Sequence, residues 1–194
     1  MKRNAQMKAF KLKKSDVFGG TLLKGNAKKA RFIPRTLPMH ITLKSDMATG
    51  ALSMLKCDRD IRKIIEKQAR FAGVKLYDFV NVGNHIHILA KFHNRVLYKR
   101  FIRSITGLIA RRVLGAQRGA ASAAGVKFWA YKPYSRIIHA GRRHYQNVRT
   151  YMAKNRAELF GAKREWINSS DPAAASLLEI LKDWDSAFTE RVLC

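Results

Sequence analysis

Apolar and polar residues alternate in three short stretches of the chain, a pattern typical of strands that bury one face of a sheet. The first stretch, His40–Lys44, contains β-branched residues, and the second and third cover 76–82 and 85–91. Gly83-Asn84 separates the last two stretches, and this pair favours a two-residue hairpin turn. The second and third strands are therefore predicted to be antiparallel neighbours.

Apolar residues at helical spacing predict two helices in the same region. Asp58 or Asp60 can cap the first helix, and Gly73 can end it. Asn94 can cap a longer second helix. The residues predicted to face inward are Ile61, Ile64, Ile65, Ala69 and Ala72 in the first helix, and Leu97, Phe101, Ile105, Leu108 and Ile109 in the second.

Two further elements complete the predicted central unit. Residues 128–139 contain a fourth strand that Pro133 interrupts, and residues 142–160 form the last helix. The order is strand, helix, strand, strand, helix, strand, helix, and the first six elements match the split β-α-β, or ferredoxin-like, arrangement. We therefore expect an α+β fold with an antiparallel sheet.

The distribution of charge divides the chain into three predicted parts. Residues 1–38 are a basic N-terminal arm, residues 39–161 are the central domain, and residues 162–194 are a more acidic C-terminal extension. In the extension, Asp171-Pro172 is typical of a helix N-cap followed by the first helical residue. The resulting amphipathic helix is expected to dock on the core through Leu177, Leu181, Trp184 and Phe188.

Composition narrows the classes of protein to which the chain can belong. Its 194 residues include 39 Lys and Arg against 13 Asp and Glu, which gives a net charge of +26. Such an excess favours a polyanionic partner, and nucleic acid is the most common one. No apolar run is long enough to span a membrane, so no membrane association is expected. Two cysteines are too few for a disulfide scaffold or a Cys-type zinc finger.

The acidic residues are absent from the middle of the sequence. Between Asp78 and Glu158 the chain has no carboxylate side chain but many Lys and Arg. An active site within this interval has to function without Asp or Glu. Glycosidases with paired carboxylates and two-metal nucleases rich in carboxylates are therefore disfavoured.

The most informative local motif is His85-Ile86-His87 in the third predicted strand. Residues two apart in a strand lie on the same face, so the two imidazoles project together. Neighbouring imidazoles can hold a divalent metal ion. The alternative is that they are ordinary polar side chains on a half-exposed sheet face.

The last predicted helix adds a phenol and an amide to this motif. Tyr151 and Asn155 are four positions apart and share one helix face, which His144 and Val148 extend. Asn155 offers a neutral oxygen ligand, whereas Tyr151 offers a nucleophile. Alternatively, Tyr151 is a core aromatic residue with a hydrogen-bonded hydroxyl. Tyr145 is a second candidate nucleophile, but it points about 120° away around the helix.

Four segments together indicate a family. They are MHITLKS (39–45), NVGNHIHIL (81–89), RSITGLIAR (103–111) and VRTYMAKN (148–155). With these segments the sequence resembles the single-tyrosine HUH transposases, which include the IS200-like and REP-associated tyrosine transposases, over about residues 31–161. HUH stands for His-hydrophobic-His. One departure is Arg156, which follows Asn155 where many relatives have Pro or Gln.

The resemblance implies a chemistry for these residues. His85 and His87 would hold Mg²⁺ or Mn²⁺, with Asn155 as the third ligand. Tyr151 would attack phosphorus in single-stranded or hairpin DNA and form a covalent phosphotyrosine, from which a strand can be rejoined without ATP. A protein of this kind is expected to be bacterial, to act at the nucleoid in the cytoplasm and to function as a monomer or a homodimer.

Two basic regions are expected to contact the DNA. One is the exposed face of helix 94–114, which lacks a balancing acid, and the other is segment 128–136, where aromatic residues alternate with cations. A solvated helix face and an aromatic core strand are the respective alternatives. The basic residues predicted to bind nucleic acid are Arg95, Lys99, Arg103, Arg111, Arg112, Lys132 and Arg136.

Other function classes match the sequence less well. A histidine-triad hydrolase needs a third alternating histidine where Leu89 stands, and a two-histidine phosphoesterase needs a second copy of His40-Ile41-Thr42. A Walker-type NTPase needs a glycine-rich phosphate loop, which the sequence lacks. A non-catalytic ferredoxin-like protein that binds DNA or RNA, such as a domesticated relative of the transposases, remains the alternative hypothesis.

Overall fold

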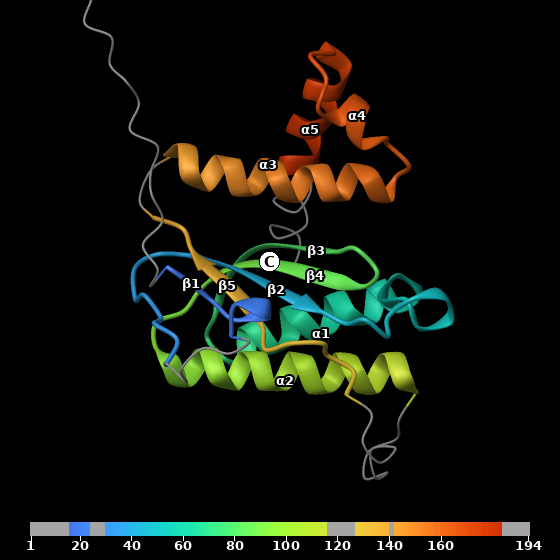
Figure 1. The fold of residues 1–194 in the computed structure, drawn as a ribbon. Helices are drawn as coiled ribbons and strands as arrows, with labels where there is room; N and C mark the ends of the chain where they lie inside the picture. The colour runs from blue at the N-terminus through green and yellow to red at the C-terminus, as the bar shows by residue number, and fades with distance from the viewer. Residues whose placement is uncertain (1–15, 24–29, 116–126, 140–141, 184–194) are drawn as a thin grey trace, which may run out of the picture.

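The elements of the protein are stacked in layers (Figure 1). Helices α1 (Asp58–Phe71) and α2 (Arg95–Leu114) lie on one side of a sheet, and α3 (Arg142–Leu159) lies on the other. Helices α4 (Arg164–Ile167) and α5 (Pro172–Asp183) lie on the outer side of α3. None of the helices in the described part of the chain is long and apolar enough to cross a membrane. The computed structural model describes residues 16–23, 30–115, 127–139 and 142–183.

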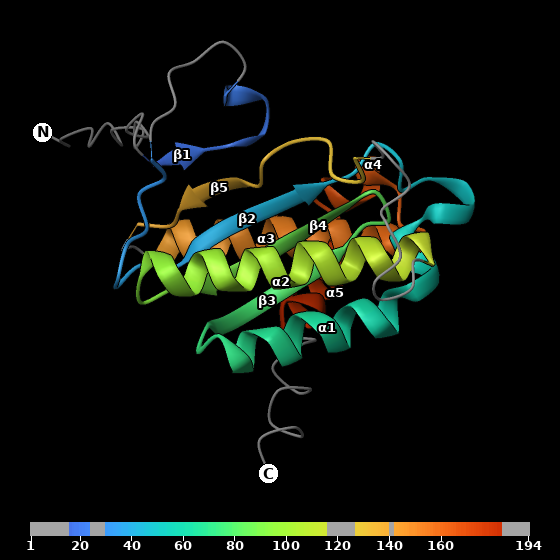
Figure 2. The same ribbon diagram turned by 90° about the horizontal axis from the view of Figure 1, so that it is seen from below.

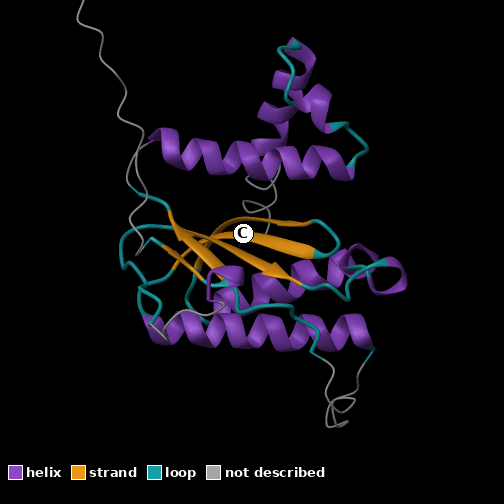
Figure 3. Ribbon diagram, viewed as in Figure 1, coloured by secondary structure: helices purple, strands orange, loops and turns teal. Residues whose placement is uncertain are grey.

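In the described part of the chain, five antiparallel strands form the sheet in the order β1-β5-β2-β4-β3 (Figures 2 and 3). Apart from the short edge strand β1, the chain follows the order β2-α1-β3-β4-α2-β5 and places β2 and β4 in the centre of the sheet. This is the ferredoxin-like arrangement, so the predicted α+β fold is confirmed. The strands are β1 (Val17–Phe18), β2 (Met39–Lys44), β3 (Lys75–Asn81), β4 (His85–Lys91) and β5 (Tyr134–Ile137).

The predicted hairpin turn and the cap of α2 occur where the sequence places them, but the predicted cap of α1 by Asp58 or Asp60 is wrong, because both lie inside the first turn and the N-cap is Cys57, whose side chain makes no capping hydrogen bond. Gly83 has a φ of 95°, and the backbone N–H of Val82 donates to the carbonyl oxygen of His85 across the hairpin, at 2.9 Å. Asn94 caps α2, because its Oδ1 accepts a hydrogen bond of 2.9 Å from the backbone N–H of Leu97. These local interactions fix the positions where β4 and α2 begin.

The sheet face toward α1 and α2 is apolar, because alternate strand residues point to it. Ile41 and Leu43 of β2, and Ile86 and Ile88 of β4, are each at most 2% exposed. Full burial of a side chain of this size contributes about 1.5–3 kcal/mol. This layer therefore forms a rigid base for the opposite face of the sheet. The helical residues that cover it include Ile61, Ile65, Ala69, Phe101, Ile105 and Ile109.

The buried face of α2 is centred differently from the prediction. Tyr98 and Ile102 are buried, whereas Leu97 and Leu108, which were expected to face inward, are only partly buried. The reason is tertiary: the ring of Phe92 packs against that of Tyr98 with centroids 5.1 Å apart. Spacing along the helix alone cannot locate such a contact.

The predicted segment 128–139 contains the fourth strand, which occupies only the part after Pro133. It begins at Tyr134, because Pro133 has no N–H for the sheet ladder. Phe128 is buried in the core, and the indole N–H of Trp129 donates to the carbonyl oxygen of Thr106 at 3.0 Å. Phe128 is therefore a core residue and cannot stack on bases, and Trp129 is partly buried against the core with its N–H already bonded.

The described part of the predicted N-terminal arm is folded against the domain. Strand β1 pairs with β5, and Gly20 N–H donates to the carbonyl oxygen of Lys132 at 2.9 Å. The guanidinium of Arg31 lies over the rings of Phe18 (4.6 Å) and Tyr98 (5.0 Å) and bonds to the Tyr98 hydroxyl. Arg31 therefore links the edge strand β1 to α2 through contacts with both.

The C-terminal helix docks on α3. Its predicted N-cap is present, since Oδ1 of Asp171 accepts a hydrogen bond of 2.8 Å from the N–H of Ala173. Leu178 and Leu181 pack against Ala153 and Ala157 of α3. Helix α3 is therefore enclosed between the sheet and α5. The predicted contacts of Trp184 and Phe188 lie outside the described residues, and Leu177 is partly buried in the same cluster.

Candidate active site

The sheet face beneath α3 carries polar residues, in contrast to the apolar opposite face. In the β2–β4 ladder, Thr42 is opposite His87 and Lys44 is opposite His85. In the β2–β5 ladder, His40 is opposite Arg136. Because side chains alternate along strands, the side chains of these residues share the face that α3 covers.

The structure brings the two predicted imidazoles together. The ring centroids of His85 and His87 are 4.8 Å apart, with the ring planes at 90°. His85 is partly exposed, and its Nδ1 lies 2.6 Å from Oδ1 of Asn84. Since the amide oxygen can only accept, Nδ1 of His85 is the donor and its Nε2 carries the lone pair.

A third histidine, His40, lies beside this pair and was not predicted from the sequence to belong to the site. His40 is 9% exposed, and its Nε2 lies 3.1 Å from Nδ1 of His87. The two rings are stacked with centroids 5.1 Å apart. The hydroxyl of Thr42 is 3.2 Å from the same Nδ1. The alternation His40-Ile41-Thr42, placed next to β4 by the ferredoxin-like strand order, is the signal that could have identified His40.

One nitrogen of His87 has no partner among the described residues. Nε2 is buried and has no hydrogen-bond partner among the residues that the structure describes. Buried polar atoms without partners are rare, and at functional sites they mark places where a ligand can bind. Together with Nε2 of His85, this atom fits a divalent cation, which binds neutral imidazole. No group of three His, Cys, Asp or Glu in the described ranges could hold a metal ion, so further ligands would have to be of other types.

Burial keeps these histidines neutral. It lowers the pKa of His87 to about 2, with smaller effects from the nearby His40 and His85. Burial also lowers the pKa of His40 to about 4, assisted by the positive charge of Arg136. The pKa of His85 is lowered by burial and by Lys44. All three imidazoles are therefore in the form that binds metal at neutral pH.

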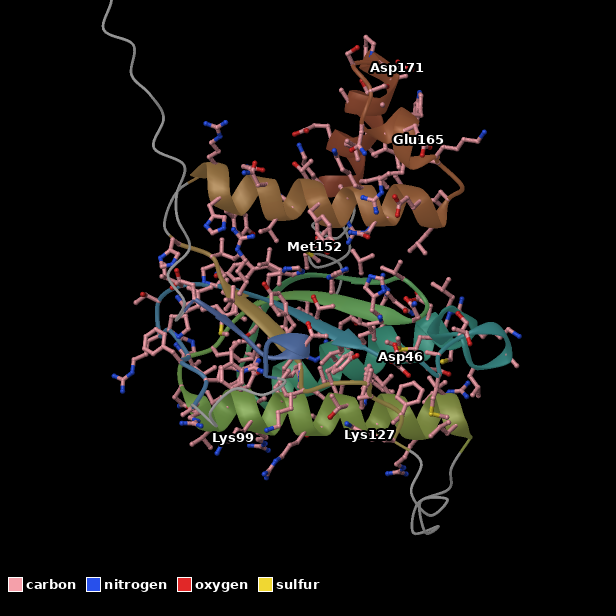
Figure 4. All side chains as sticks on the ribbon, in the orientation of Figure 1. Asp46, Lys99, Lys127, Met152, Glu165 and Asp171 are labelled. Carbon is pink, nitrogen blue, oxygen red and sulfur yellow. The ribbon has the colours of Figure 1, made fainter. Side chains whose placement is uncertain are left out.

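Tyr151 of α3 stands over the histidines. Its ring is edge-on to that of His87, with centroids 5.2 Å apart, and 6.0 Å from that of His40. The side chain is 41% exposed, so a ligand from solvent can reach it. The next residue, Met152, points from α3 toward the sheet and is fully buried (Figure 4). It packs in a cluster with Leu89 that positions the helix.

Tyr145, the second candidate nucleophile, lies in a different environment. Its ring packs edge-on against that of Tyr77 of β3, with centroids 6.1 Å apart. Burial raises the pKa of both hydroxyls. The structure therefore places Tyr151, and not Tyr145, against the histidine pair.

Asn155 lies one turn after Tyr151 and is 3% exposed. Its Nδ2 donates a hydrogen bond of 2.8 Å to the carbonyl oxygen of Tyr151. This bond uses the amide nitrogen, so the amide oxygen is the atom that could bind a cation. The role of Asn155 as a metal ligand stays a prediction.

Arg156, which follows Asn155, has a structural role. Its guanidinium is buried, and Nη2 lies 2.5 Å from Oδ1 of Asp78 and 3.2 Å from the carbonyl oxygen of Phe79. Nη1 donates to the carbonyl oxygen of Leu181 at 2.7 Å. Arg156 therefore joins α3 to β3 on one side and to α5 on the other.

A second polar cluster lies where β5 leads into α3. Nη2 of Arg136 is 3.0 Å from Nε2 of His144, and Nδ1 of His144 accepts a hydrogen bond from the N–H of His139. Nε2 of His139 is 3.0 Å from the buried carboxylate of Asp16. Arg136, predicted to bind nucleic acid, thus contributes to the wall of the site.

The basic residues of α2 lie on the opposite side of the sheet from Tyr151. Lys99, labelled in Figure 4, is on the outer layer, and it lines a shallow hollow together with Arg100 and Arg103. Arg112 forms an ion pair of 2.6 Å with Asp60 of α1. The structure therefore separates the predicted phosphate-binding helix from the histidines. Arg95, Arg111 and Lys132 are exposed.

Comparisons with known proteins extend these observations. The family model described as IS200-like transposase matches residues 37–155. One similar solved structure is a REP-associated tyrosine transposase bound to a REP hairpin, at 13% identity and a TM-score of 0.47, covering 69% of this chain and 74% of that one. Another is a candidate transposase from Deinococcus radiodurans R1, at 16% identity and a TM-score of 0.38, covering 66% of this chain and 98% of that one. No curated protein matches the chain.

Proposed function

The chain belongs to the IS200-like transposase family, and we propose that it cleaves and rejoins single-stranded DNA through a covalent bond to Tyr151. The observation that carries this proposal is the contact between the Tyr151 ring and His87, 5.2 Å apart between centroids, with His85 alongside. A solvent-accessible phenol next to a pair of neutral imidazoles is a suitable arrangement for a nucleophile at a phosphate-binding centre.

The proposed cleavage is a substitution at phosphorus. The phenolic oxygen of Tyr151 bonds to the scissile phosphorus, and its proton is lost to solvent. The bond from phosphorus to one sugar oxygen breaks, and that oxygen takes up a proton to become a free hydroxyl. The reverse reaction, with the hydroxyl of another strand end, rejoins DNA and regenerates the phenol. The phosphotyrosine conserves the bond energy, so no ATP is needed.

The neutral donor set suits Mg²⁺ or Mn²⁺ bound by His85 and His87, with Asn155 as a third ligand. The bound ion would polarise the scissile phosphate and offset charge on its non-bridging oxygens. The chain supplies neutral nitrogens for this purpose and, in this part of the sequence, no carboxylate that would repel the DNA. His85 presents Nε2 because Asn84 holds its Nδ1.

Single-stranded DNA, alone or as part of a hairpin, is the proposed substrate because a flexible backbone can be bent for in-line attack. The net charge of +26 supports binding to the phosphate backbone. The exposed cations Lys99 and Arg103 on α2 would hold a part of the DNA distant from Tyr151. One chain contains both the histidines and the tyrosine, so the proposed reaction does not require a second copy to complete the site.

The test is a covalent adduct assay. End-labelled single-stranded DNA is incubated with the protein and Mn²⁺ and separated on a denaturing gel. We expect label retained on the wild-type protein and on Tyr145→Phe, the matched control, but not on Tyr151→Phe. His85→Ala should abolish the adduct and leave salt-sensitive DNA binding largely intact. Absence of any adduct, with DNA binding retained, would instead support the non-catalytic DNA-binding protein.

A further inference from the structure

We propose that His40 is a positioning residue for His87: its Nε2 accepts a hydrogen bond from Nδ1 of His87, which leaves Nε2 of His87 as the nitrogen with an available lone pair. The purpose of this arrangement rests on the proposed function, because it prepares His87 to bind a cation. The hydrogen bond itself can be tested in the protein without metal or DNA, and therefore independently of the proposed function.

The geometry around His87 limits the placement of its proton. A neutral imidazole has one N–H, on either Nδ1 or Nε2. Nδ1 has two possible partners, Nε2 of His40 at 3.1 Å and Oγ1 of Thr42 at 3.2 Å. Nε2 of His87 is buried and has no partner in the described part of the chain.

The two tautomers differ in the group that is left unpaired. With the proton on Nε2, a buried N–H would have no acceptor, and no cation could satisfy it. With the proton on Nδ1, the N–H has an acceptor in His40, and the unpaired atom is a lone pair that a cation can use. His85 already shows the same arrangement, because its Nδ1 donates to Asn84. Both histidines would then present Nε2.

The placement of His40 suits an orienting role. It is almost completely buried, and its ring is stacked on that of His87 with an interplanar angle of 26°. Central strand β2 holds it between Leu89 of β4 and Arg136 of β5, so it has little freedom to move. A partner on the second imidazole nitrogen fixes the ring orientation and raises the basicity of the ligand nitrogen, and removal of such a partner lowers metal affinity about 10–100-fold.

The first experiment uses the wild-type protein free of metal. Long-range ¹H–¹⁵N NMR correlations of the imidazole rings assign the tautomer of each histidine. We expect a protonated Nδ1 and an unprotonated Nε2 in His87. The opposite tautomer overturns the proposal, whether or not the protein cleaves DNA.

The second experiment measures Mn²⁺ affinity by electron paramagnetic resonance, together with the thermal unfolding midpoint of each variant. His40→Phe keeps a ring but has no acceptor, so we expect Mn²⁺ binding about 10–100-fold weaker. His40→Gln supplies an amide oxygen near the position of Nε2 and should restore most of the affinity. Thr42→Val, which removes the other neighbour of Nδ1, is the matched control and should change affinity little.

The outcomes separate this proposal from the proposed function. Unchanged affinity in His40→Phe, no recovery in His40→Gln, or an equal loss in Thr42→Val overturns the role of His40. If the wild-type protein binds no Mn²⁺, the metal site of the proposed function fails, and the tautomer of His87 alone decides the present inference. If a variant fails to fold, the tautomer of His87 in the wild-type protein still decides the proposal.

Discussion

Arg156 of α3 and Asp78 of β3 form a buried ion pair across 78 positions of sequence, with Nη2 2.5 Å from Oδ1. The same guanidinium also bonds to the backbone of α5 through Leu181. Because Tyr151 is on the same helix, this pair helps to hold the phenol above the histidines of its own chain. Arg156, which follows Asn155 in the chain, therefore anchors the helix that carries the candidate nucleophile.

The first prediction concerns this anchor. Arg156→Met leaves the Asp78 carboxylate buried without the guanidinium, which should cost about 3–5 kcal/mol in the free energy of unfolding. Urea denaturation measures the change. Lys154→Met, on the same helix but bonded to the exposed Asn168, is the control and should cost less than about 1 kcal/mol. The double variant Asp78→Leu with Arg156→Met should recover stability relative to Arg156→Met alone. Equal stability of Arg156→Met and the control would show that the pair does not anchor α3.

Local patterns in the sequence were sufficient to predict most of the fold. Alternation in β2 and β4, the Gly83-Asn84 turn and the Asn94 cap depend on neighbouring residues, and all three are present in the structure. The pairing of His85 with His87 also follows from the period of a strand. What the sequence could not show depends on contacts between distant segments.

Three examples illustrate such contacts. Strand β1 has only two residues and exists because β5 offers an edge for it. Trp129 packs against the core, where the carbonyl oxygen of Thr106 of α2 accepts its N–H. His40 belongs to the site because the strand order places β2 beside β4. Each could be anticipated only by applying the tertiary arrangement to individual side chains, a step beyond recognition of the fold class.

The second prediction is a loss of stability at acidic pH that depends on His40. Its pKa is about 4 in the folded protein against an ordinary value of 6.5, so the unfolded chain binds the proton first as pH falls. The contribution of His40 to the free energy of unfolding is fully present above pH 6.5. It is lost as the pH falls from 6.5 to about 4, by at most about 1.4 kcal/mol per pH unit. Urea denaturation at about pH 7, 6 and 5 measures this slope.

His87 and His85 act in the same direction, since their pKa values are also lowered, so the total slope includes them. The contribution of His40 is isolated by His40→Phe. This variant should reduce the number of protons taken up on unfolding, which the slope of stability against pH measures, by up to one. His93→Gln removes an exposed histidine and serves as the control. A slope that His40→Phe and the control change equally would contradict the prediction.

The third prediction concerns the outer face of α2. The affinity for single-stranded DNA falls with salt, and the slope of log affinity against log salt concentration is about 0.7 for each phosphate that the protein neutralises. Replacing Lys99 and Arg103 by Gln should therefore make this slope shallower by about 0.7 for each of the two cations that contacts a phosphate. Fluorescence anisotropy at several salt concentrations measures it. The yield of covalent adduct at saturating DNA should be unchanged, because the sheet separates this face from Tyr151.

A charge-balanced control accompanies this measurement. Arg112 pairs with Asp60, so the double variant Asp60→Asn with Arg112→Gln removes one charge of each sign and leaves the net charge as it was. It should alter the salt slope less than the Lys99 and Arg103 variant does. If both variants have the same slope as the wild type, α2 does not contact the DNA.

The last prediction tests whether the described part of the N-terminal region belongs to the fold. Gly19 has a φ of 92°, and a Cβ there would lie 2.0 Å from the carbonyl oxygen of Pro133, so Gly19→Ala forces β1 away from β5. Hydrogen exchange should then show loss of protection at the N–H of Ile137, which bonds to Asp16 at 2.9 Å, while amides in α1 stay protected. Gly107→Ala in α2 is the control, because no atom of the described residues lies within 4 Å of its added Cβ, and it should stabilise the helix by about 1 kcal/mol. Retained protection at Ile137 in Gly19→Ala would mean that β1 is not needed to hold the edge of the sheet.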